Sequence, residues 1–290
     1  MIGVDWGTSH VRAYRLDDKG TVLARRDSND GVLSVAPGRY GEILRGLVGS
    51  WVGDGERRVL LSGTVGSRNG WRETHPISTP ARLTDLAGAV ERVPFDEACV
   101  RIVSGIAGVD ASGVPEVMRG EETEIVGSGI EQGLLCLPGS HSKWVRVTGG
   151  AIMGYTTYLT GEAFAALKAH TLLAKLMGPE PPVAGAAFDD GVERSGQPGG
   201  LLHHLFGVRT LGLVGRLASA DSSSYLSGLV VGHEVRSAME GNGEVTVIGA
   251  STLAPLYVRA INSCGGRARL GPANSAARGL AIIGARVAWD

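Results

Sequence analysis

Two short segments of the chain share one arrangement of apolar, glycine and hydroxyl residues. The first runs from Met1 to Ser9 and reads MIGVDWGTS, and the second runs from Leu134 to Lys143 and reads LLCLPGSHSK. Each pattern predicts a buried strand, a tight turn and a return strand, over residues 11–16 in the first copy and 144–147 in the second. Such turns offer backbone N–H groups and hydroxyls to anionic oxygens. Two of them facing each other across a cleft would clamp phosphates, which favours ATP as a ligand.

The residues of the two turns are the first candidates for nucleotide binding. They are Gly7, Thr8 and Ser9 in the first copy and Gly139, Ser140, His141, Ser142 and Lys143 in the second. Asp5 ends the first strand, and its carboxylate is expected to hold Mg²⁺ against the phosphates, through water. The alternatives are an Asx turn at Asp5 and a solvated side chain at Lys143. The role of His141 stays open, but the presence of both turns favours nucleotide binding.

The composition is that of an ordinary globular protein. The chain has 290 residues, 43% of them hydrophobic and 20% charged, with a formal net charge of -1. This length allows one large or two medium domains, and the near-neutral charge gives no reason to expect a nucleic acid or a membrane surface as partner. The sequence has no signal-peptide pattern or membrane-spanning stretch, and its three cysteines lack metal-site spacing. We expect a cytoplasmic protein that binds small molecules.

The order of the predicted elements is that of two similar α/β halves. In the first half we expect strands over residues 2–6, 11–16, 21–26, 58–62 and 100–106, and helices over 39–52 and 84–90, and we expect a helix from 121 to 127 that leads into the second half. In the second half we expect strands over 133–137, 142–147, 150–158, 245–248 and 268–270, helices from 161, over 200–219, 221–240 and 252–263 and from 274, and a loop over 189–200. This order is typical of ribonuclease H-like domains. Two such domains, over residues 1–120 and 121–290, with a nucleotide cleft between them, match the fold of actin, hexokinase and the Hsp70 ATPase.

Several segments resemble the 2-dehydro-3-deoxygalactonokinase family of sugar-acid kinases. They are DWGTS at 5–9, GTVGSRNGW at 63–71, MRGEET at 118–123, LPGSHSKW at 137–144, TGE at 160–162, YLSGL at 225–229 and GAST at 249–252. These segments follow the family's order over essentially the whole chain, and MRGEET is the most specific. The resemblance implies phosphorylation of 2-dehydro-3-deoxygalactonate at its 6-hydroxyl, with ATP and Mg²⁺ as cofactors.

Adjacent carboxylates follow Gly120 at the start of a predicted helix. Glu121 or Glu122 could act as the general base for the attacking hydroxyl, or both could simply stabilise the helix N-terminus. In sugar kinases of the glycerol- and xylulose-kinase type, a Gly-Asp pair supplies the base at the corresponding place, which favours Glu121. Arg119 could bind the substrate carboxylate or the transferring phosphoryl group, or form a structural ion pair.

The loop over residues 63–71 is the candidate substrate site. Related sugar kinases place substrate-binding side chains there, and the candidates in this chain are Ser67, Arg68, Asn69 and Trp71. Arg68 suits bidentate binding of a carboxylate, and Trp71 could form an apolar wall. A solvated turn is the alternative for Asn69.

Gly249, Ala250 and Ser251 follow a predicted buried strand and open a helix. Small residues there would let adenine and ribose pass close to the backbone, although an ordinary capped helix start gives the same pattern. His203, His204 and His233 have no metal-site spacing and are expected to be structural.

Two other functions remain as alternatives to this kinase. One is a kinase of a related 2-keto-3-deoxy sugar acid, and the other is a phosphatase or ATPase on the same fold. A sugar-sensing repressor of this fold would carry a helix-turn-helix before the first hairpin, so the start of this sequence at the hairpin argues against one. The sequence leaves open whether a second copy of the chain is a partner in a homodimer.

Overall fold

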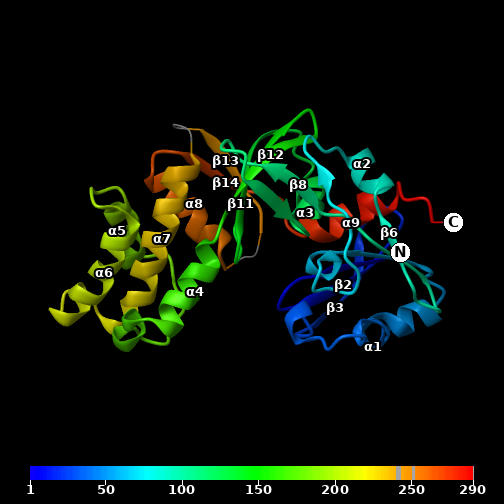
Figure 1. The fold of residues 1–290 in the computed structure, drawn as a ribbon, viewed down its shortest axis with the longest axis horizontal. Coiled ribbons are helices and arrows are strands. Elements are labelled where there is room, and N and C mark those ends of the chain that lie inside the picture. The colour runs from blue at the N-terminus through cyan, green and yellow to red at the C-terminus, as the bar shows by residue number, and fades with distance from the viewer. Residues whose placement is uncertain (240–242, 250–251, 290) are drawn as a thin grey trace. The chain divides into compact units, whose positions relative to one another are not determined.

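The computed structural model describes residues 1–239, 243–249 and 252–289 of an α/β chain (Figure 1). The chain divides into two compact units. The first comprises Met1–Gln132, Arg146–Tyr155 and Pro272–Asp290, and the second comprises Gly133–Val145 and Thr156–Gly271. This division differs from the expected boundary at residue 120. The difference arises because α3 (Glu121–Ser128) packs along α9 (Ser275–Gly284) within the first unit.

The main sheet of the first unit has six strands. In spatial order they are β3 (Val22–Ser28), β2 (Val11–Leu16), β1 (Ile2–Trp6), β4 (Arg58–Ser62), β7 (Cys99–Ile102) and β6 (Glu91–Val93). The central strands β1, β4 and β7 are parallel, and the other three are antiparallel to their neighbours. Because central parallel strands are covered on both faces, they carry continuous apolar runs such as Val59, Leu60 and Leu61, all fully buried. The predicted strands over 2–6, 11–16 and 58–62 are confirmed.

The first unit also contains two further helices and a small second sheet. The helices are α1 (Tyr40–Gly53) and α2 (Leu83–Gly88), and the sheet has the order β5 (Ile77–Ser78), β8 (Ile106–Val109), β9 (Pro115–Met118). The single strand predicted over 100–106 is wrong, because the chain leaves β7 after Ile102 and enters β8 at Ile106. Between them Gly105 packs against β9, where an added Cβ would lie 2.4 Å from the Met118 carbonyl oxygen.

The five-stranded sheet repeats the strand order of five strands of the six-stranded main sheet. Its spatial order is β12 (Ala151–Tyr158), β11 (Ser142–Thr148), β10 (Gln132–Leu137), β13 (Glu244–Val247) and β14 (Arg267–Leu270). In both sheets, three strands that are consecutive in the chain lie side by side. The earliest of the three in sequence (β1 or β10) then pairs with a parallel strand, and a second parallel strand follows, as β4 and β7 do in the main sheet and β13 and β14 do here. The predicted return strands of both hairpins are therefore confirmed as β2 and β11.

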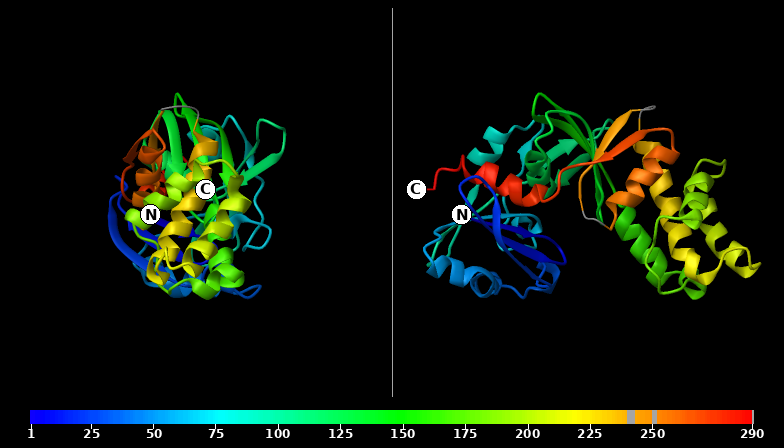
Figure 2. Two further views of the ribbon diagram at one scale, coloured as in Figure 1. Left: turned by 90° about the vertical axis from the view of Figure 1, so that its left-hand side faces the viewer. Right: turned by 180° about the vertical axis from the view of Figure 1, so that it is seen from behind.

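Among the described residues, five helices belong to the second unit (Figure 2, green through yellow to orange). They are α4 (Thr160–His170), α5 (Ala186–Ser195), α6 (Gly200–Leu213), α7 (Ser222–Ala238) and α8 (Ala254–Ser263). Helix α7 packs against the other four. The loop predicted over 189–200 is wrong, because α5 occupies much of it. Gly191 and Gly228 let α5 and α7 meet backbone to backbone, since an added Cβ at Gly191 would lie 2.2 Å from the Tyr225 carbonyl oxygen.

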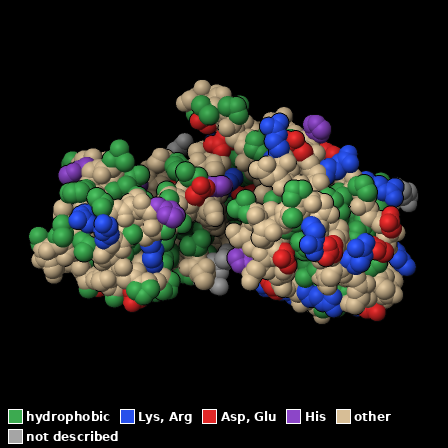
Figure 3. All heavy atoms as spheres, turned by 60° about the horizontal axis from the view of Figure 1, so that its bottom comes forward, with side chains coloured by type: hydrophobic (Ala, Val, Ile, Leu, Met, Phe, Trp, Pro, Cys, Tyr) green, Lys and Arg blue, Asp and Glu red, His purple; other side chains and the backbone are tan. Residues whose placement is uncertain are grey.

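The surface agrees with the near-neutral net charge. On the face of the first unit drawn at the right of Figure 3, basic and acidic side chains lie interspersed. Within the described part of the chain, no helix combines the length and the apolar character that crossing a membrane requires.

Candidate functional site

The first hairpin turn lies where β1 and β4 end. The Gly7 N–H donates to the His10 carbonyl at 2.9 Å and closes the turn, and Thr8 and Ser9 are exposed. The Thr8 hydroxyl lies 3.1 Å from that of Thr64, the second residue after β4. The turn is therefore tied to the start of the predicted substrate loop.

Two glycines allow three chain segments to meet beside this turn. Gly63 has φ 104°, and an added Cβ would lie 2.6 Å from the Trp6 carbonyl oxygen. Gly120 has φ 113°, and its Cβ would lie 3.2 Å from the Cα of Gly63. Only glycine adopts such conformations readily and leaves this space free. The end of β1, the end of β4 and the start of α3 therefore lie close together.

Four carboxyl groups gather at this junction, and we call Asp5, Glu121, Glu122 and Glu124 the carboxylate cluster. Burial raises the pKa of Asp5, Arg12 opposes this shift, and the charge of Glu121 adds to it. Burial, and then the charges of Asp5 and Glu121, raise the pKa of Glu124 to about 8. Glu121 thus influences the other three carboxyl groups, so the predicted base and the predicted metal ligand lie near each other.

Glu122 differs from Glu121 in its burial. Its side chain is fully buried, accepts the Gly120 N–H at 2.7 Å and lies 3.4 Å from the Ser62 hydroxyl. Burial, and then the charge of Glu121, raise the pKa of Glu122 to about 8. Glu122 therefore fixes the entry to α3, whereas the partly exposed Glu121 stands at the first position of the helix.

The sequence analysis missed Arg12 on β2. Its guanidinium lies 3.3 Å from the Asp5 carboxylate and 3.7 Å from that of Asp27 on β3. Residues opposite each other in an antiparallel pair interact directly, and Asp5 pairs with Arg12 in the β1–β2 register. Counting that register from the turn would have found this cation.

The substrate-loop residues lie in different surroundings. Arg68 is 86% exposed, with its Nε 3.8 Å from Glu73, and the exposed Asn69 uses its carbonyl to accept the Tyr40 hydroxyl at 3.0 Å. Ser67 is partly buried. The Trp71 ring stacks on Tyr40 and packs into the core of the first unit, so its position also has a structural explanation.

Arg119 points toward the residues that follow this loop. Its guanidinium donates to the Thr74 carbonyl at 3.1 Å. Its buried Nε has no hydrogen-bond partner among the residues that the structure describes. Arg119 therefore joins the loop to the start of α3 and retains a donor for a ligand.

The second hairpin turn lies in the second unit, between β10 and β11. Ser142 and Lys143 are buried, and the Lys143 ammonium donates to the His141 carbonyl at 3.0 Å, so the solvated alternative for Lys143 is wrong. Gly139 and Ser140 pack against the start of α4, where the Glu162 N–H donates to the Ser140 carbonyl at 3.0 Å. The His141 ring lies 2.5 Å from the Glu162 carboxylate.

One residue of the predicted adenosine site meets this turn. Gly249, which follows β13, lies against Pro138, which follows β10, because these two strands are parallel neighbours. The other predicted adenosine residues, Ala250 and Ser251, lie outside the described residues. His204 and His233 contact each other at 3.0 Å, between α6 and α7.

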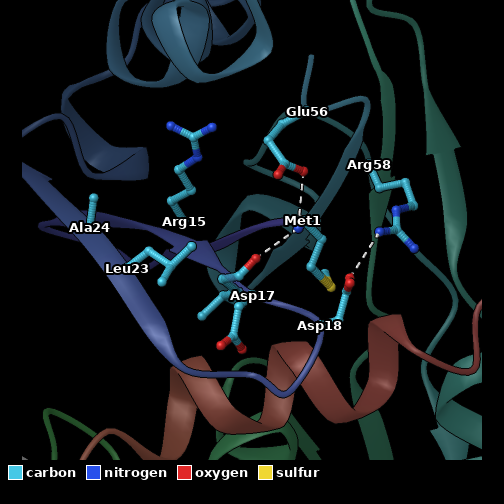
Figure 4. A pocket seen from close by; sticks show the side chains of 9 residues that line it. Met1, Arg15, Asp17, Asp18, Leu23, Ala24, Glu56 and Arg58 are labelled. Atoms are coloured by element: carbon cyan, nitrogen blue, oxygen red, sulfur yellow. Dashed lines mark hydrogen bonds and ion pairs between the residues drawn. The ribbon is translucent and has the colours of Figure 1, made fainter. Parts of the chain in front are cut away.

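A pocket of about 330 Å³ lies elsewhere in the first unit, beside Met1, which precedes β1 (Figure 4). Its charged groups pair with one another: the Met1 amino group with Glu56 at 3.0 Å, and Arg58 with Asp18 at 3.9 Å. Of the predicted site residues that the structure describes, none lines it. We therefore do not assign the site to this pocket.

The donor set fits a magnesium ion held mainly by phosphates. Across residues 1–239, 243–249 and 252–289, no three histidine, cysteine or acidic side chains are grouped as metal ligands. Mg²⁺ commonly takes one or two protein carboxylates and completes its shell with phosphate oxygens and water. Asp5, with 20% of its side chain exposed and other carboxyl groups close by, is suited to that role.

Comparisons with known proteins identify the family of this chain. A family described as 2-keto-3-deoxy-galactonokinase matches residues 5–283. This chain belongs to that family. It is 36% identical to the Rhizobium meliloti (strain 1021) protein named Probable 2-dehydro-3-deoxygalactonokinase DgoK1, over 99% of this chain and 96% of that protein. It is 29% identical to the 2-dehydro-3-deoxygalactonokinase of Escherichia coli (strain K12), over 91% and 90% of the two chains.

Solved structures also resemble this chain. A Sinorhizobium meliloti crystal structure assigned as a 2-dehydro-3-deoxygalactonokinase has a TM-score of 0.90 at 35% identity and covers 98% of this chain and 95% of its own. The activator of 2-hydroxyisocaproyl-CoA dehydratase from Clostridium difficile has a TM-score of 0.52 at 12% identity and covers 97% and 92%. This second likeness concerns the fold alone.

Replacing Glu122 by Gln is expected to weaken the pH dependence of folding stability. The pKa of Glu122 rises from 4.5 to about 8 on folding, so the folded state binds this proton more tightly than the unfolded chain. The contribution is fully present below pH 4.5 and is lost as the pH rises toward 8, by up to about 1.4 kcal/mol per pH unit. Urea unfolding from about pH 5 to about pH 8 measures the difference between the two proteins. The same pH dependence in both would contradict a buried, protonated Glu122.

Proposed function

We propose that this chain is an ATP-dependent kinase that phosphorylates 2-dehydro-3-deoxy-D-galactonate at its 6-hydroxyl in galactonate catabolism. Membership of the 2-keto-3-deoxy-galactonokinase family and the names of its relatives support the substrate. The observation that supports the chemistry is the close approach of the end of β1, which carries Asp5, and the start of α3, which carries Glu121, at the junction of Gly63 and Gly120. A cytoplasmic location fits a metabolic kinase supplied with ATP.

In this proposal Glu121 is the general base. The 6-hydroxyl oxygen forms a bond to the γ-phosphorus, the bond from that phosphorus to the β–γ bridging oxygen breaks, and ADP leaves. The hydroxyl proton passes to the Glu121 carboxylate. Its partial exposure supports this role, since Glu122 is fully buried and already accepts a backbone N–H.

The two hairpin turns would hold the phosphates. Gly7, Thr8 and Ser9 offer backbone donors and exposed hydroxyls, and Ser140 and Lys143 offer a hydroxyl and a cation. Asp5 would bind Mg²⁺, which neutralises charge on the phosphates. We also infer that the two sheets are the cores of two ribonuclease H-like domains of the actin and hexokinase type, which bind one nucleotide together. Their repeated strand order supports this inference.

The substrate carboxylate needs a cation, and two arginines are candidates. We assign it to Arg68, which is exposed and whose nearest acidic partner is 3.8 Å away. Arg119, with a buried Nε that lacks a partner among the described residues, is assigned to the transferring phosphoryl group. Asn69 and Ser67 remain proposed partners for substrate hydroxyls. Gly249 remains, with Ala250 and Ser251, the proposed adenosine site.

A coupled assay of ADP release against a panel of sugars tests the function. We expect turnover with 2-dehydro-3-deoxygalactonate and very little with neutral hexoses or glycerol, because a sugar without the carboxylate cannot form the charge-assisted, bidentate pair with Arg68. Turnover of a related 2-keto-3-deoxy acid alone would correct the substrate. Efficient phosphorylation of neutral sugars would overturn the sugar-acid assignment, and ADP release without any acceptor would indicate an ATPase.

Replacing Glu121 by Gln is expected to lower kcat by about two to four decades while ATP still binds, because a general base typically contributes that much. Glu122→Gln is the matched control, since the same change one residue along affects a fully buried side chain whose oxygen already accepts the Gly120 N–H, an acceptor that Gln keeps. Kinetics with saturating sugar acid and calorimetric ATP binding measure both effects. Loss of turnover in the control with near-normal turnover in Glu121→Gln would move the base to Glu122.

Replacing Asp5 by Asn is expected to raise the Mg²⁺ concentration needed for half-maximal rate, because the site loses its charged oxygen ligand. The KM for the sugar acid should change little. A Mg²⁺ titration of the rate, with Asp27→Asn as a nearby control that also loses an Arg12 partner, measures the effect. An unchanged Mg²⁺ titration would contradict the metal-binding role and indicate that Asp5 is an ordinary turn residue.

A further inference from the structure

A buried carboxylate lies in the core of the second unit, outside the proposed site. Glu234 on α7 is 3% exposed and lies among the apolar side chains of α7, α8 and β11. One of its oxygens accepts the Trp144 indole N–H at 2.8 Å, and the other accepts the Tyr257 hydroxyl at 2.7 Å. The side chains of Ser142 and Thr160 also act on its carboxylate and lower its pKa. A single acidic group therefore has two hydrogen-bond donors and two further polar neighbours.

These partners come from three elements that surround the second hairpin turn. Ser142 and Trp144 belong to β11, which leaves the turn, and Thr160 is the first residue of α4. Tyr257 belongs to α8, and its hydroxyl also lies 2.7 Å from the Ser142 hydroxyl. Glu234 thus connects the return strand of the turn with the two helices next to it.

The start of α4 is itself pressed against the turn. Gly161 follows Thr160, and an added Cβ there would lie 2.3 Å from the Gly139 carbonyl oxygen. A shift of Thr160 or Ser142 would therefore move the backbone that carries Gly139 and Ser140.

Stability alone gives a weak reason for this carboxylate. Burial raises the pKa of Glu234, which reflects the cost of removing its charge from water. An apolar side chain of similar volume in such a place is often neutral or stabilising. A fully hydrogen-bonded network does, however, hold its members in one geometry.

We propose that Glu234 is a positioning residue for nucleotide binding, and that its hydrogen bonds to Trp144 and Tyr257, with the neighbouring hydroxyls of Ser142 and Thr160, hold the second hairpin turn in the geometry that receives ATP phosphates. This inference rests on the proposed function, because it assumes that the turn over residues 138–141 binds phosphate. Glu234 acts through Ser142, Thr160 and Tyr257, and it touches neither substrate.

The test compares ATP affinity and catalysis in Glu234→Leu and Glu234→Gln. Leu accepts no hydrogen bonds, so we expect the Kd and the KM for ATP to rise by about tenfold or more, since small misplacements of binding groups have large effects. Gln keeps one acceptor oxygen and should lie between Leu and the natural chain. The KM for the sugar acid should stay within about twofold, because its proposed contacts belong to the first unit.

Val235→Ala is the matched control. Val235 is the next residue of α7, is fully buried and has no polar partner to lose, so its replacement should lower stability and leave the Kd for ATP unchanged. Calorimetry with Mg²⁺ and ATP gives Kd, and near-UV circular dichroism confirms that each variant is folded. If the Leu variant does not fold, the Gln variant decides.

The outcomes separate this inference from the function on which it rests. If the natural chain binds ATP and both Glu234 variants bind it with a Kd within about twofold of the natural value, the positioning role alone would be overturned. An equal rise in Kd in Val235→Ala would also overturn it, because general loosening of the core would then explain the effect. No ATP binding by the natural chain would overturn the kinase proposal and this inference together.

Discussion

The contact between the Gly63 backbone and the Trp6 carbonyl is the constraint on which the carboxylate cluster depends. An added Cβ at Gly63 would lie 2.6 Å from that oxygen, so a larger residue would push the ends of β1 and β4 apart. Gly120 then packs on Gly63 and brings the start of α3 to the same point. Neighbouring parallel strands thereby deliver Asp5 and the Thr64 hydroxyl, and the helix delivers Glu121.

This arrangement brings together carboxyl groups whose charges raise one another's pKa. Arg12 is the cation that contacts Asp5, and it is shared with Asp27. Protonation of Glu122 and Glu124, whose pKa values rise to about 8, relieves part of the repulsion. A magnesium ion that arrives with ATP would relieve more of it, so the crowding itself favours the ligand that we propose.

Local patterns predicted the positions of the elements that carry chemistry. The Asp-Trp-Gly-Thr-Ser and Pro-Gly-Ser-His-Ser-Lys turns follow short apolar strands, and the structure has strands ending at Trp6 and Leu137. Parallel strands are strongly apolar when both faces are covered, so β1, β4 and β10 could be predicted from the sequence alone. The roles of Glu121, Asp5 and the turn residues remain predictions, since they concern ligands and not folding.

What the sequence did not indicate depends on contacts between distant segments. Gly191 looked like a loop residue, but it packs α5 against Tyr225 of α7, more than thirty positions away. Membership of α3 in the first unit depends on α9, at the other end of the chain. The partners of Glu234 on α7 likewise come from β11 and α8, which are separate segments of the chain. Periodicity within one segment carries no information about such pairs.

The most direct measurement is a crystal structure of the protein with Mg²⁺, a non-hydrolysable ATP analogue and 2-dehydro-3-deoxygalactonate. The account predicts the 6-hydroxyl oxygen within about 3 Å of the Glu121 carboxylate and in line with the γ-phosphorus. It also predicts the metal ion beside Asp5 and the phosphates against the turn residues of both hairpins. A sugar hydroxyl bound away from Glu121, or a nucleotide bound in the pocket beside Met1, would contradict it.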